Sequence, residues 1–242
     1  MRIGCVPYGH AKPFSGAWAG REVVWDHPKE LVGRLRSGEV DVALVPVWEV
    51  LTNPGYQVID GVAVGSRGEV RSVAVFHDKP LGECAGIDLT GRSMTSVQLW
   101  RLLAEGKMRI RMEERAGGEA RLRIGDEALV EWKKRNGRGV TDLGREWWEW
   151  TGQPFVFAVW AVGPGTKVGA ADLESFRRAC QEGTQRSGDW AKDEMEKEYL
   201  TRCIRYGLGR EEKKGMEEFA RRSGVPEIRV ELVLTPHAPT AS

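Results

Sequence analysis

The longest uninterrupted apolar run of the chain, Phe155–Val162, is eight residues long. This length is typical of a strand rather than of a helix. Further β-like runs lie at 2–6, 22–25, 41–45, 58–64, 70–76, 108–112, 121–124 and 228–234, and helical patterns lie at 28–37, 97–104 and 128–134. This alternation predicts α/β layers around a largely parallel sheet. From residue 171 to residue 222 the pattern is helical and heavily charged.

The 242 residues allow one sizeable core or two small lobes that share a hinge. A formal net charge of +1 gives no general attraction to nucleic acid or to a membrane, so an anionic substrate must be held by local donors. The chain begins without the basic and apolar regions of a signal peptide, and no window approaches the roughly 20 apolar residues of a membrane span. We therefore expect a cytoplasmic protein.

The four cysteines form no C-x-x-C pair, and no histidine cluster lies beside them; they are Cys5, Cys84, Cys180 and Cys203. This spacing predicts reduced and mostly buried thiols rather than a metal site. Dinucleotide-binding, P-loop, nucleophile-elbow and zinc-protease motifs are also absent from the sequence.

The segment 7–14 (PYGHAKPF) directly follows the first predicted strand. In α/β sheets ligands bind at the carboxyl ends of strands. Pro13 could open a helix whose first N–H groups attract a carboxylate, and His10 could act as a general base near neutral pH. A surface loop with Tyr8 packed on the core is the alternative, and the residues alone leave both open.

Three further segments offer polar groups. Segment 93–96 (SMTS) begins a helix, where hydroxyls and free amides form an anion cradle or simply cap the helix. In 68–73 (GEVRSV), Arg71 and Ser72 would lie on opposite faces of a strand. Asp126 follows another strand and suits an N-cap better than an acid. Most of the ten Trp residues are expected in the core, although one or two could line the site of a planar ring.

Several of these segments occur in the order of a known family. The blocks are 2–14 (RIGCVPYGHAKPF), 38–46 (GEVDVALVP), 68–73, 93–96, 124–129 (IGDEAL) and 142–160 (DLGREWWEWTGQPFVFAVW). Together they resemble the chorismate dehydratase family of the futalosine route to menaquinone, over about residues 2 to 220. The resemblance implies a two-lobed α/β fold similar to type II periplasmic binding proteins, with a ligand cleft at the hinge. We place lobe I at 1–76 and 185–242, and lobe II at 77–184.

The implied reaction is dehydration of chorismate to 3-[(1-carboxyvinyl)oxy]benzoate, which needs no cofactor and no metal. The resemblance implies a small carboxylate substrate, no nucleic-acid or membrane partner, and a monomer or homodimer. His10 takes the position of a family Asn and would be the catalytic base or a hydrogen-bond donor. The expected substrate-binding residues are Tyr8, Ser72, Ser93, Thr95, Ser96, Asp126 and Phe157.

The chain departs from the family pattern in three places. The family's Leu-Asn is Gly9-His10, an Asp before the SMTS block is Thr90, and the segment 97–123 is shorter than expected. Two alternatives to the dehydratase therefore stay open. One is a non-catalytic small-anion binder or sensor on the same scaffold. The other is an enzyme for a related acid, such as the later naphthoate-forming step.

Overall fold

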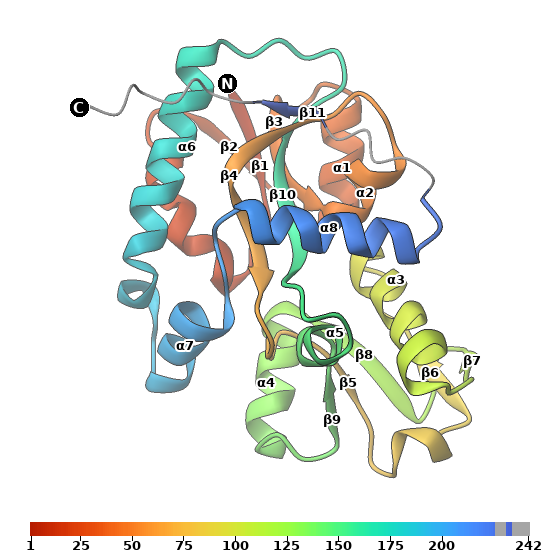
Figure 1. Cartoon of the computed structure of the whole chain (residues 1–242). Helices are drawn as coiled ribbons and strands as arrows, with labels where there is room; N and C mark the ends of the chain where they lie inside the picture. The colour runs from red at the N-terminus through yellow and green to blue at the C-terminus, as the bar shows by residue number, and fades with distance from the viewer. Residues whose placement is uncertain (226–230, 234–242) are drawn as a thin grey trace.

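The computed structural model describes residues 1–225 and 231–233 and contains two β-sheets in two lobes (Figure 1). The first sheet has the strand order β11-β4-β10-β3-β1-β2. Its strands are β1 (Arg2–Cys5), β2 (Glu22–Trp25), β3 (Val42–Pro46), β4 (Gln57–Ser66), β10 (Phe155–Val162) and β11 (Glu231–Val233). The second sheet has the order β7-β6-β8-β5-β9. It contains β5 (Val73–Phe76), β6 (Gly86–Asp88), β7 (Glu113–Glu114), β8 (Ala120–Ile124) and β9 (Val140–Asp142).

The apolar strand β10 lies inside the first sheet, which confirms the strand predicted from its length. It pairs antiparallel with both β3 and β4, whereas β1 pairs parallel with β2 and β3. The sheet is therefore mixed rather than largely parallel. The reason is that the chain leaves the first lobe along β4 and returns along β10 in the opposite direction. Every residue of β10 except Ala158 is buried.

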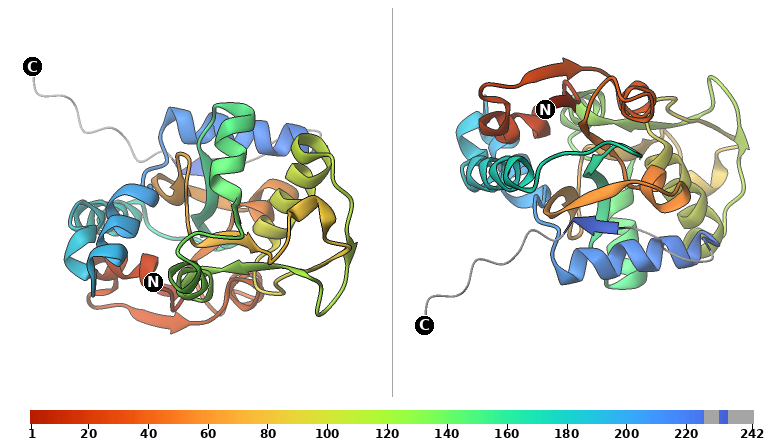
Figure 2. Two further views of the ribbon diagram at one scale, coloured as in Figure 1. Left: turned by 90° about the horizontal axis from the view of Figure 1, so that it is seen from below. Right: turned by 90° about the horizontal axis from the view of Figure 1, so that it is seen from above.

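Helices cover the sheets on both sides. The first lobe carries η1 (Gly9–Trp18), α1 (Pro28–Arg36), α2 (Val47–Thr52), α6 (Ala170–Gln185), η4 (Ser187–Trp190), α7 (Glu194–Glu198), η5 (Tyr199–Cys203) and α8 (Arg210–Arg222). The second lobe carries η2 (Leu81–Glu83), α3 (Met94–Leu102), η3 (Leu103–Met108), α4 (Gly125–Arg135) and α5 (Leu143–Thr151). Seen from above in the right panel of Figure 2, η1 and α1 lie on one side of the first lobe and α8 on the other.

Local sequence explains the main helix ends. Pro28 begins α1, whose Leu31 and Leu35 are spaced by one turn and fully buried. Asp142 caps α5 by accepting a hydrogen bond from the Arg145 amide, and Gly152 ends this helix in the left-handed region with φ of 67°.

The lobe boundaries were predicted after residues 76 and 184. The chain passes from one sheet to the other at different points. β5 belongs to the second sheet and β10 to the first, while α6 packs against η1 and β4. The chain thus crosses to the second lobe between Ser66 and Val73 and returns between Thr151 and Phe155. Apolar strands such as β5 and β10 can pair in either sheet, so local sequence does not fix the crossing points.

Several predicted elements need correction. The predicted strand at 108–112 is absent from the described residues, because η3 continues to Met108 and Arg109 takes a left-handed conformation with φ of 55°. The strand predicted at 70–76 begins only at Val73. Pro13 lies inside the 3-10 helix η1 rather than at the start of a helix. Of the strand predicted at 228–234, β11 (Glu231–Val233) is described, and the remaining positions lie outside the described residues.

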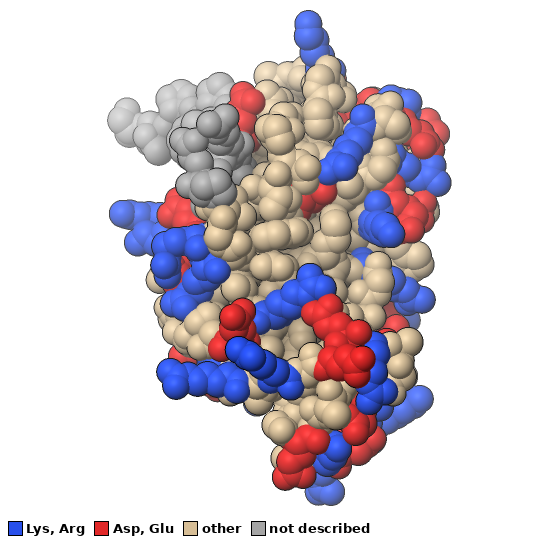
Figure 3. Space-filling view, turned by 90° about the vertical axis from the view of Figure 1, so that its right-hand side faces the viewer, with Lys and Arg blue, Asp and Glu red and all other residues tan. Residues whose placement is uncertain are grey.

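One continuous apolar core runs through both lobes and includes Trp160 of β10, Trp147 of α5 and Leu122 of β8. A second, smaller cluster of Ala74, Phe76 and Ala128 lies under α4. On the face drawn in Figure 3, acidic and basic side chains are interleaved rather than gathered by sign. Among the described residues, no helix is both long and apolar enough to cross a membrane.

Candidate functional site

A cavity lies between the lobes, where several strands and helices end. The first lobe contributes the segment after β1, the end of β3, the start of α1 and part of β10. The second lobe contributes the start of β5, the end of β8 and the beginnings of α3 and α4. The lining residues are Val6, Tyr8, His10, Pro28, Leu44, Pro46, Ser72, Val73, Ser93, Ser96, Ile124, Gly125, Phe157 and Ala158. This position agrees with the rule that ligands bind beyond the carboxyl ends of strands.

The segment around Tyr8 is held against the second lobe by two contacts. The Gly9 amide donates to Asp126 Oδ1 at 3.1 Å. Gly125 has φ of +60°, and a side chain there would begin 3.2 Å from the Tyr8 ring. Only glycine therefore combines this backbone conformation with the close approach of the ring.

His10 lies among three tyrosines. Its Nδ1 is 3.5 Å from the Tyr199 hydroxyl, and its carbonyl accepts a hydrogen bond from Tyr206 Oη at 3.1 Å. The Tyr8 ring centre is 5.6 Å from that of His10. Burial lowers the pKa of His10 to about 4, and the negative charge of Asp126 opposes this shift. His10 is therefore neutral at pH 7, so one ring nitrogen can accept a hydrogen bond or a proton.

Tyr8 remains protonated at pH 7. Burial raises the pKa of its phenol, Arg92 opposes the shift, and Asp126 adds to it. The phenol oxygen lies 3.3 Å from His27 Nδ1. Tyr8 can therefore donate a hydrogen bond into the cavity or share its proton with His27.

Hydroxyl groups line the second-lobe wall. Ser93 is the N-cap of α3, and its Oγ accepts from the Ser96 amide at 3.2 Å and lies 2.9 Å from Ser96 Oγ. Ser72 precedes β5 and is buried. Because α3 and α4 both begin at this wall, their unpaired amides and positive dipole ends favour anionic groups.

Six of the eight predicted site residues thus meet at one cavity: Tyr8, His10, Ser72, Ser93, Ser96 and Phe157. The other two predicted residues, Thr95 and Asp126, do not line the cavity. Thr95 Oγ1 is fully buried and accepts from the Trp48 amide at 3.1 Å, which joins α3 to α2. The predicted N-cap role of Asp126 is wrong: Ile124 occupies that position, and Asp126 binds Gly9 instead.

Sequence reasoning missed three neighbours of the site, which are His27, Tyr199 and Tyr206. His27 precedes the helix-starting Pro28, and nothing local relates it to Tyr8. Tyr199 lies in a charged helical segment, 189 residues from the histidine that it approaches. Only its aromatic character among charged neighbours could have marked it as buried. Within residues 1–225 and 231–233, no three His, Cys, Asp or Glu side chains are grouped to hold a metal ion.

With two mixed sheets and a cavity between them, the molecule has a periplasmic-binding-protein-like fold. A protein of Archaeoglobus fulgidus is similar with a TM-score of 0.67 at 17% identity, covering 93% of this chain and 97% of that one. A Candida albicans gene product described as having the generic periplasmic binding protein fold has a TM-score of 0.63 at 11% identity, covering 93% and 90%. At these identities the likeness concerns the fold.

A family model described as menaquinone biosynthesis matches residues 1–224, and the chain belongs to that family. A chorismate dehydratase of Thermus thermophilus is 31% identical to it over 239 residues. The alignment covers 86% of this chain and 88% of the relative. The resemblance inferred from the sequence blocks is thereby confirmed.

Proposed function

We propose that the chain is a chorismate dehydratase of menaquinone biosynthesis, which converts chorismate to 3-[(1-carboxyvinyl)oxy]benzoate and water. One observation carries the proposal: in a member of this family, the inter-lobe cavity gathers Tyr8, neutral His10 and the hydroxyls of Ser72, Ser93 and Ser96. The relative from Thermus thermophilus, which has this activity by name, aligns along most of the chain.

The reaction requires little of the protein beyond position and proton transfer. A ring C–H bond breaks, its electrons complete the aromatic ring, and the C–O bond to the ring hydroxyl breaks. The proton and the hydroxide leave together as one water molecule. Because aromatisation makes the step favourable, the cavity has to orient the ring, accept the proton and assist the departing hydroxyl.

His10 and Tyr8 suit these two proton roles. The low pKa of His10 keeps an imidazole nitrogen unprotonated at pH 7, although it also makes the group a weak base. The raised pKa of Tyr8 keeps its phenol proton available for donation to the departing hydroxyl. We assign His10 to the ring proton and Tyr8 to the hydroxyl on this basis; transfer of a proton from His10 back to Tyr8 then restores both groups.

The substrate carries two carboxylates, and the second-lobe wall offers matching donors. Ser93 and Ser96 stand at the start of α3, and Gly125 begins α4. Hydroxyls and helix-end amides bind carboxylates well in a site that excludes water. We assign Phe157 to the face of the ring, because it lines the cavity from β10.

The test is to incubate purified protein with chorismate and to follow the aromatic product by chromatography. Turnover is expected, and His10→Ala should lower it by about 10², in line with the usual contribution of general acid–base catalysis. His77→Ala is the matched control, since His77 bonds Thr141 Oγ1 at 3.1 Å on the second sheet.

Other outcomes discriminate between the alternatives. Thermal stabilisation by chorismate without turnover would favour the non-catalytic binder or sensor. Neither turnover nor stabilisation would refute both assignments that involve chorismate. A cytoplasmic location and a monomeric or homodimeric state are further proposals, which cell fractionation and light scattering would test.

A further inference from the structure

The loop that carries Ser72 into the cavity has a conformation that needs support. Arg71 is in the left-handed region with φ of 59°, which is unfavourable for a residue with a side chain. The Ser72 amide donates to the Val70 carbonyl at 2.6 Å, and the Ser72 carbonyl accepts from the Gly125 amide at 2.8 Å. The neighbouring contacts must therefore fix this turn, because its backbone does not favour it.

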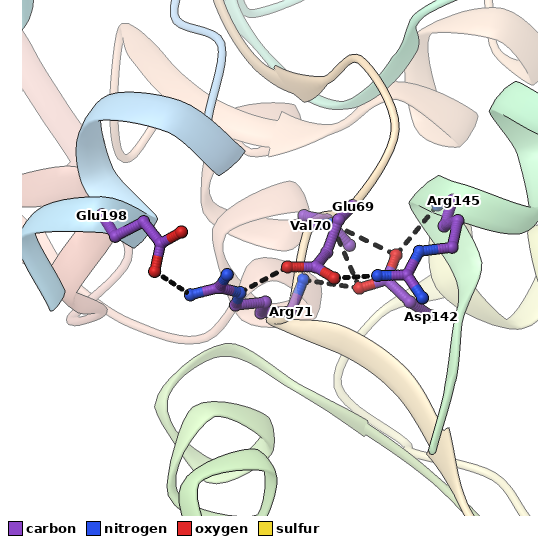
Figure 4. A network of polar contacts seen from close by, with 6 residues as sticks. All are labelled: Glu69, Val70, Arg71, Asp142, Arg145 and Glu198. Atoms are coloured by element: carbon purple, nitrogen blue, oxygen red, sulfur yellow. Dashed lines mark hydrogen bonds and ion pairs between the residues drawn. The ribbon is translucent and has the colours of Figure 1, made fainter. Parts of the chain in front are cut away.

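Asp142 supports the turn from the second lobe. Its carboxylate accepts from the Val70 amide at 3.1 Å, the Arg71 amide at 2.7 Å and the Arg145 amide at 2.9 Å (Figure 4). One carboxylate thus caps α5 and fixes the turn before β5. The position of Ser72 is in this way tied to the second lobe.

The side chain of Arg71 extends toward the first lobe. Its guanidinium contacts Glu69 Oε1 at 2.5 Å and Glu198 Oε2 at 2.9 Å (Figure 4). Only 16% of the Arg71 side chain is exposed, so these ion pairs are shielded from solvent more than most surface pairs. Glu198 is the last residue of α7, which belongs to the first lobe.

The next residue, Tyr199, contacts His10 of the cavity lining directly. Its side chain is buried, and its hydroxyl lies 3.5 Å from His10 Nδ1. Burial raises the pKa of Tyr199 far above its usual value. Two consecutive residues therefore serve both sides of the site: Glu198 pairs with Arg71 in the turn before Ser72, and Tyr199 approaches His10.

We propose that Glu198 and Tyr199 are positioning residues, which hold His10 of the first lobe and Ser72 of the second at one fixed separation. The proposal rests on the chorismate dehydratase function proposed above. Both residues lie outside the described cavity lining, so they act through His10 and Ser72 rather than on the substrate.

The first test is Tyr199→Phe, which removes the hydroxyl and keeps the ring. The loss of a hydrogen bond of typical strength predicts a fall in kcat of about 10-fold, with KM for chorismate changed less than about twofold. Tyr56→Phe is the matched control, because this buried phenol donates to Glu49 at 2.7 Å, away from the cavity. Its kcat should equal that of the wild type. A kcat of Tyr199→Phe that equals the kcat of Tyr56→Phe and of the wild type would refute the proposal.

A second test asks whether Tyr199 acts through His10. In the His10→Ala background, Tyr199→Phe should cause little further loss of kcat, because the partner of its hydroxyl is already absent. If the fall in kcat of the double variant equals the product of the two single falls, Tyr199 has a structural role that is independent of His10.

A third measurement does not depend on turnover. The Nδ1 resonance of His10 in ¹⁵N-histidine-labelled protein should shift in Tyr199→Phe and stay unchanged in Tyr56→Phe. An unchanged resonance in Tyr199→Phe would refute the positioning role. If the wild type fails to convert chorismate while this shift is present, the proposed function is wrong and the positioning role stands.

Glu198 is tested with Glu198→Gln, which keeps the side-chain size and removes the charge. We expect kcat to fall about threefold, because a partly buried ion pair contributes modestly. Glu114→Gln is the control, since it breaks the Arg101 ion pair of 2.7 Å on the second sheet and should leave kcat unchanged. A wild-type kcat in Glu198→Gln would confine the positioning role to Tyr199 and overturn it for Glu198.

Discussion

Strands β3 and β10 of the first sheet differ in burial from strand β8 of the second, although β5 of the second sheet is also fully buried. In the first sheet, all five residues of β3 are buried, and β10 is buried almost throughout. In the second sheet, β8 alternates: Ala120, Leu122 and Ile124 are buried, and the arginines between them are only partly covered. One face of β8 joins the main core. The other lies under α4, where apolar contacts are few and ion pairs are common.

The layer under α4 combines the small cluster of Ala74, Phe76 and Ala128 with ion pairs. Arg121 pairs with Glu131 of α4 at 3.1 Å, and Arg123 pairs with Asp88 at 3.0 Å and with Glu127 at 3.0 Å. Such partly exposed pairs contribute little to stability, whereas a continuous apolar core contributes most of it. In β8 the charged side chains therefore lie on the face outside the shared core.

The largest effect is expected for Trp160→Ala. Trp160 is fully buried and meets Phe14 and Phe176 edge to face. Its truncation should lower the free energy of unfolding by about 3–5 kcal/mol, measured by urea denaturation. Trp190→Ala is the control, because that side chain is 41% exposed and should change stability by less than about 1 kcal/mol. Similar losses for both would contradict the assigned burial.

A somewhat smaller loss is expected for Leu122→Ala, on the core face of β8. We expect about 2–3 kcal/mol, since the side chain is fully buried in the shared core. The unfolding transition should shift as a whole, by fluorescence and by circular dichroism. Two separate transitions would show that the lobes unfold independently and that the core is not shared.

One buried titratable group in each lobe, His10 in the first and Asp142 in the second, affects the pH dependence of stability in opposite directions. Burial lowers the pKa of His10 to about 4, so the unfolded chain takes up this proton first, and stability falls as the pH drops from about 6.5 to 4. Burial raises the pKa of Asp142 from 3.8 to about 6, against the opposing N–H donors. The folded chain then takes up that proton first, so this group favours folding below pH 4 and loses its contribution as the pH rises through 6.

Each group changes the slope by at most about 1.4 kcal/mol per pH unit, with opposite sign. Between pH 4 and 6, His10→Gln should make stability fall more with rising pH than in the wild type, and Asp142→Asn should make it rise more. Urea midpoints at four pH values measure the slopes. Slopes that change in the same direction in both variants would contradict the assignment.

The smallest effect is expected for Arg121→Gln. This change removes one ion pair under α4 and should cost less than about 1 kcal/mol, decreasing further in high salt. Urea denaturation at low and high salt measures it. A loss above about 2 kcal/mol would show that the charged layer contributes as much as the apolar one.

Local patterns predicted strands with uniform burial, such as β10, and strands with mixed burial, such as β2 and β8. β10 was found because eight consecutive apolar residues fit one strand covered on both faces. The lobe boundaries were not found, because the pairing of β5 with β8 and β9 rather than with the first sheet depends on distant residues. The prediction of a strand at 108–112 was wrong because Arg109 adopts a left-handed conformation, which an arginine in a sequence does not indicate.

The candidate site was predictable where its residues follow strand ends or begin helices. Tyr8, His10, Ser93 and Ser96 fall in such places, and the strand-end rule brings them together. Thr95 directly precedes Ser96 in sequence but turns to α2, since helical residues one position apart face different directions. Tyr199 could not be found, because its role depends on a contact with a histidine at the other end of the chain.

The two places where the chain crosses between the lobes lie side by side. β4 and β10 are hydrogen-bonded neighbours, with Phe155 opposite Ser66 at their ends. Two adjacent crossings define one axis, so any rotation of one lobe against the other must change the backbone of both crossing segments, 67–72 and 152–154, together. The width of the cavity mouth then depends on a single angle, and a ligand bridging both walls would fix that angle without altering either sheet.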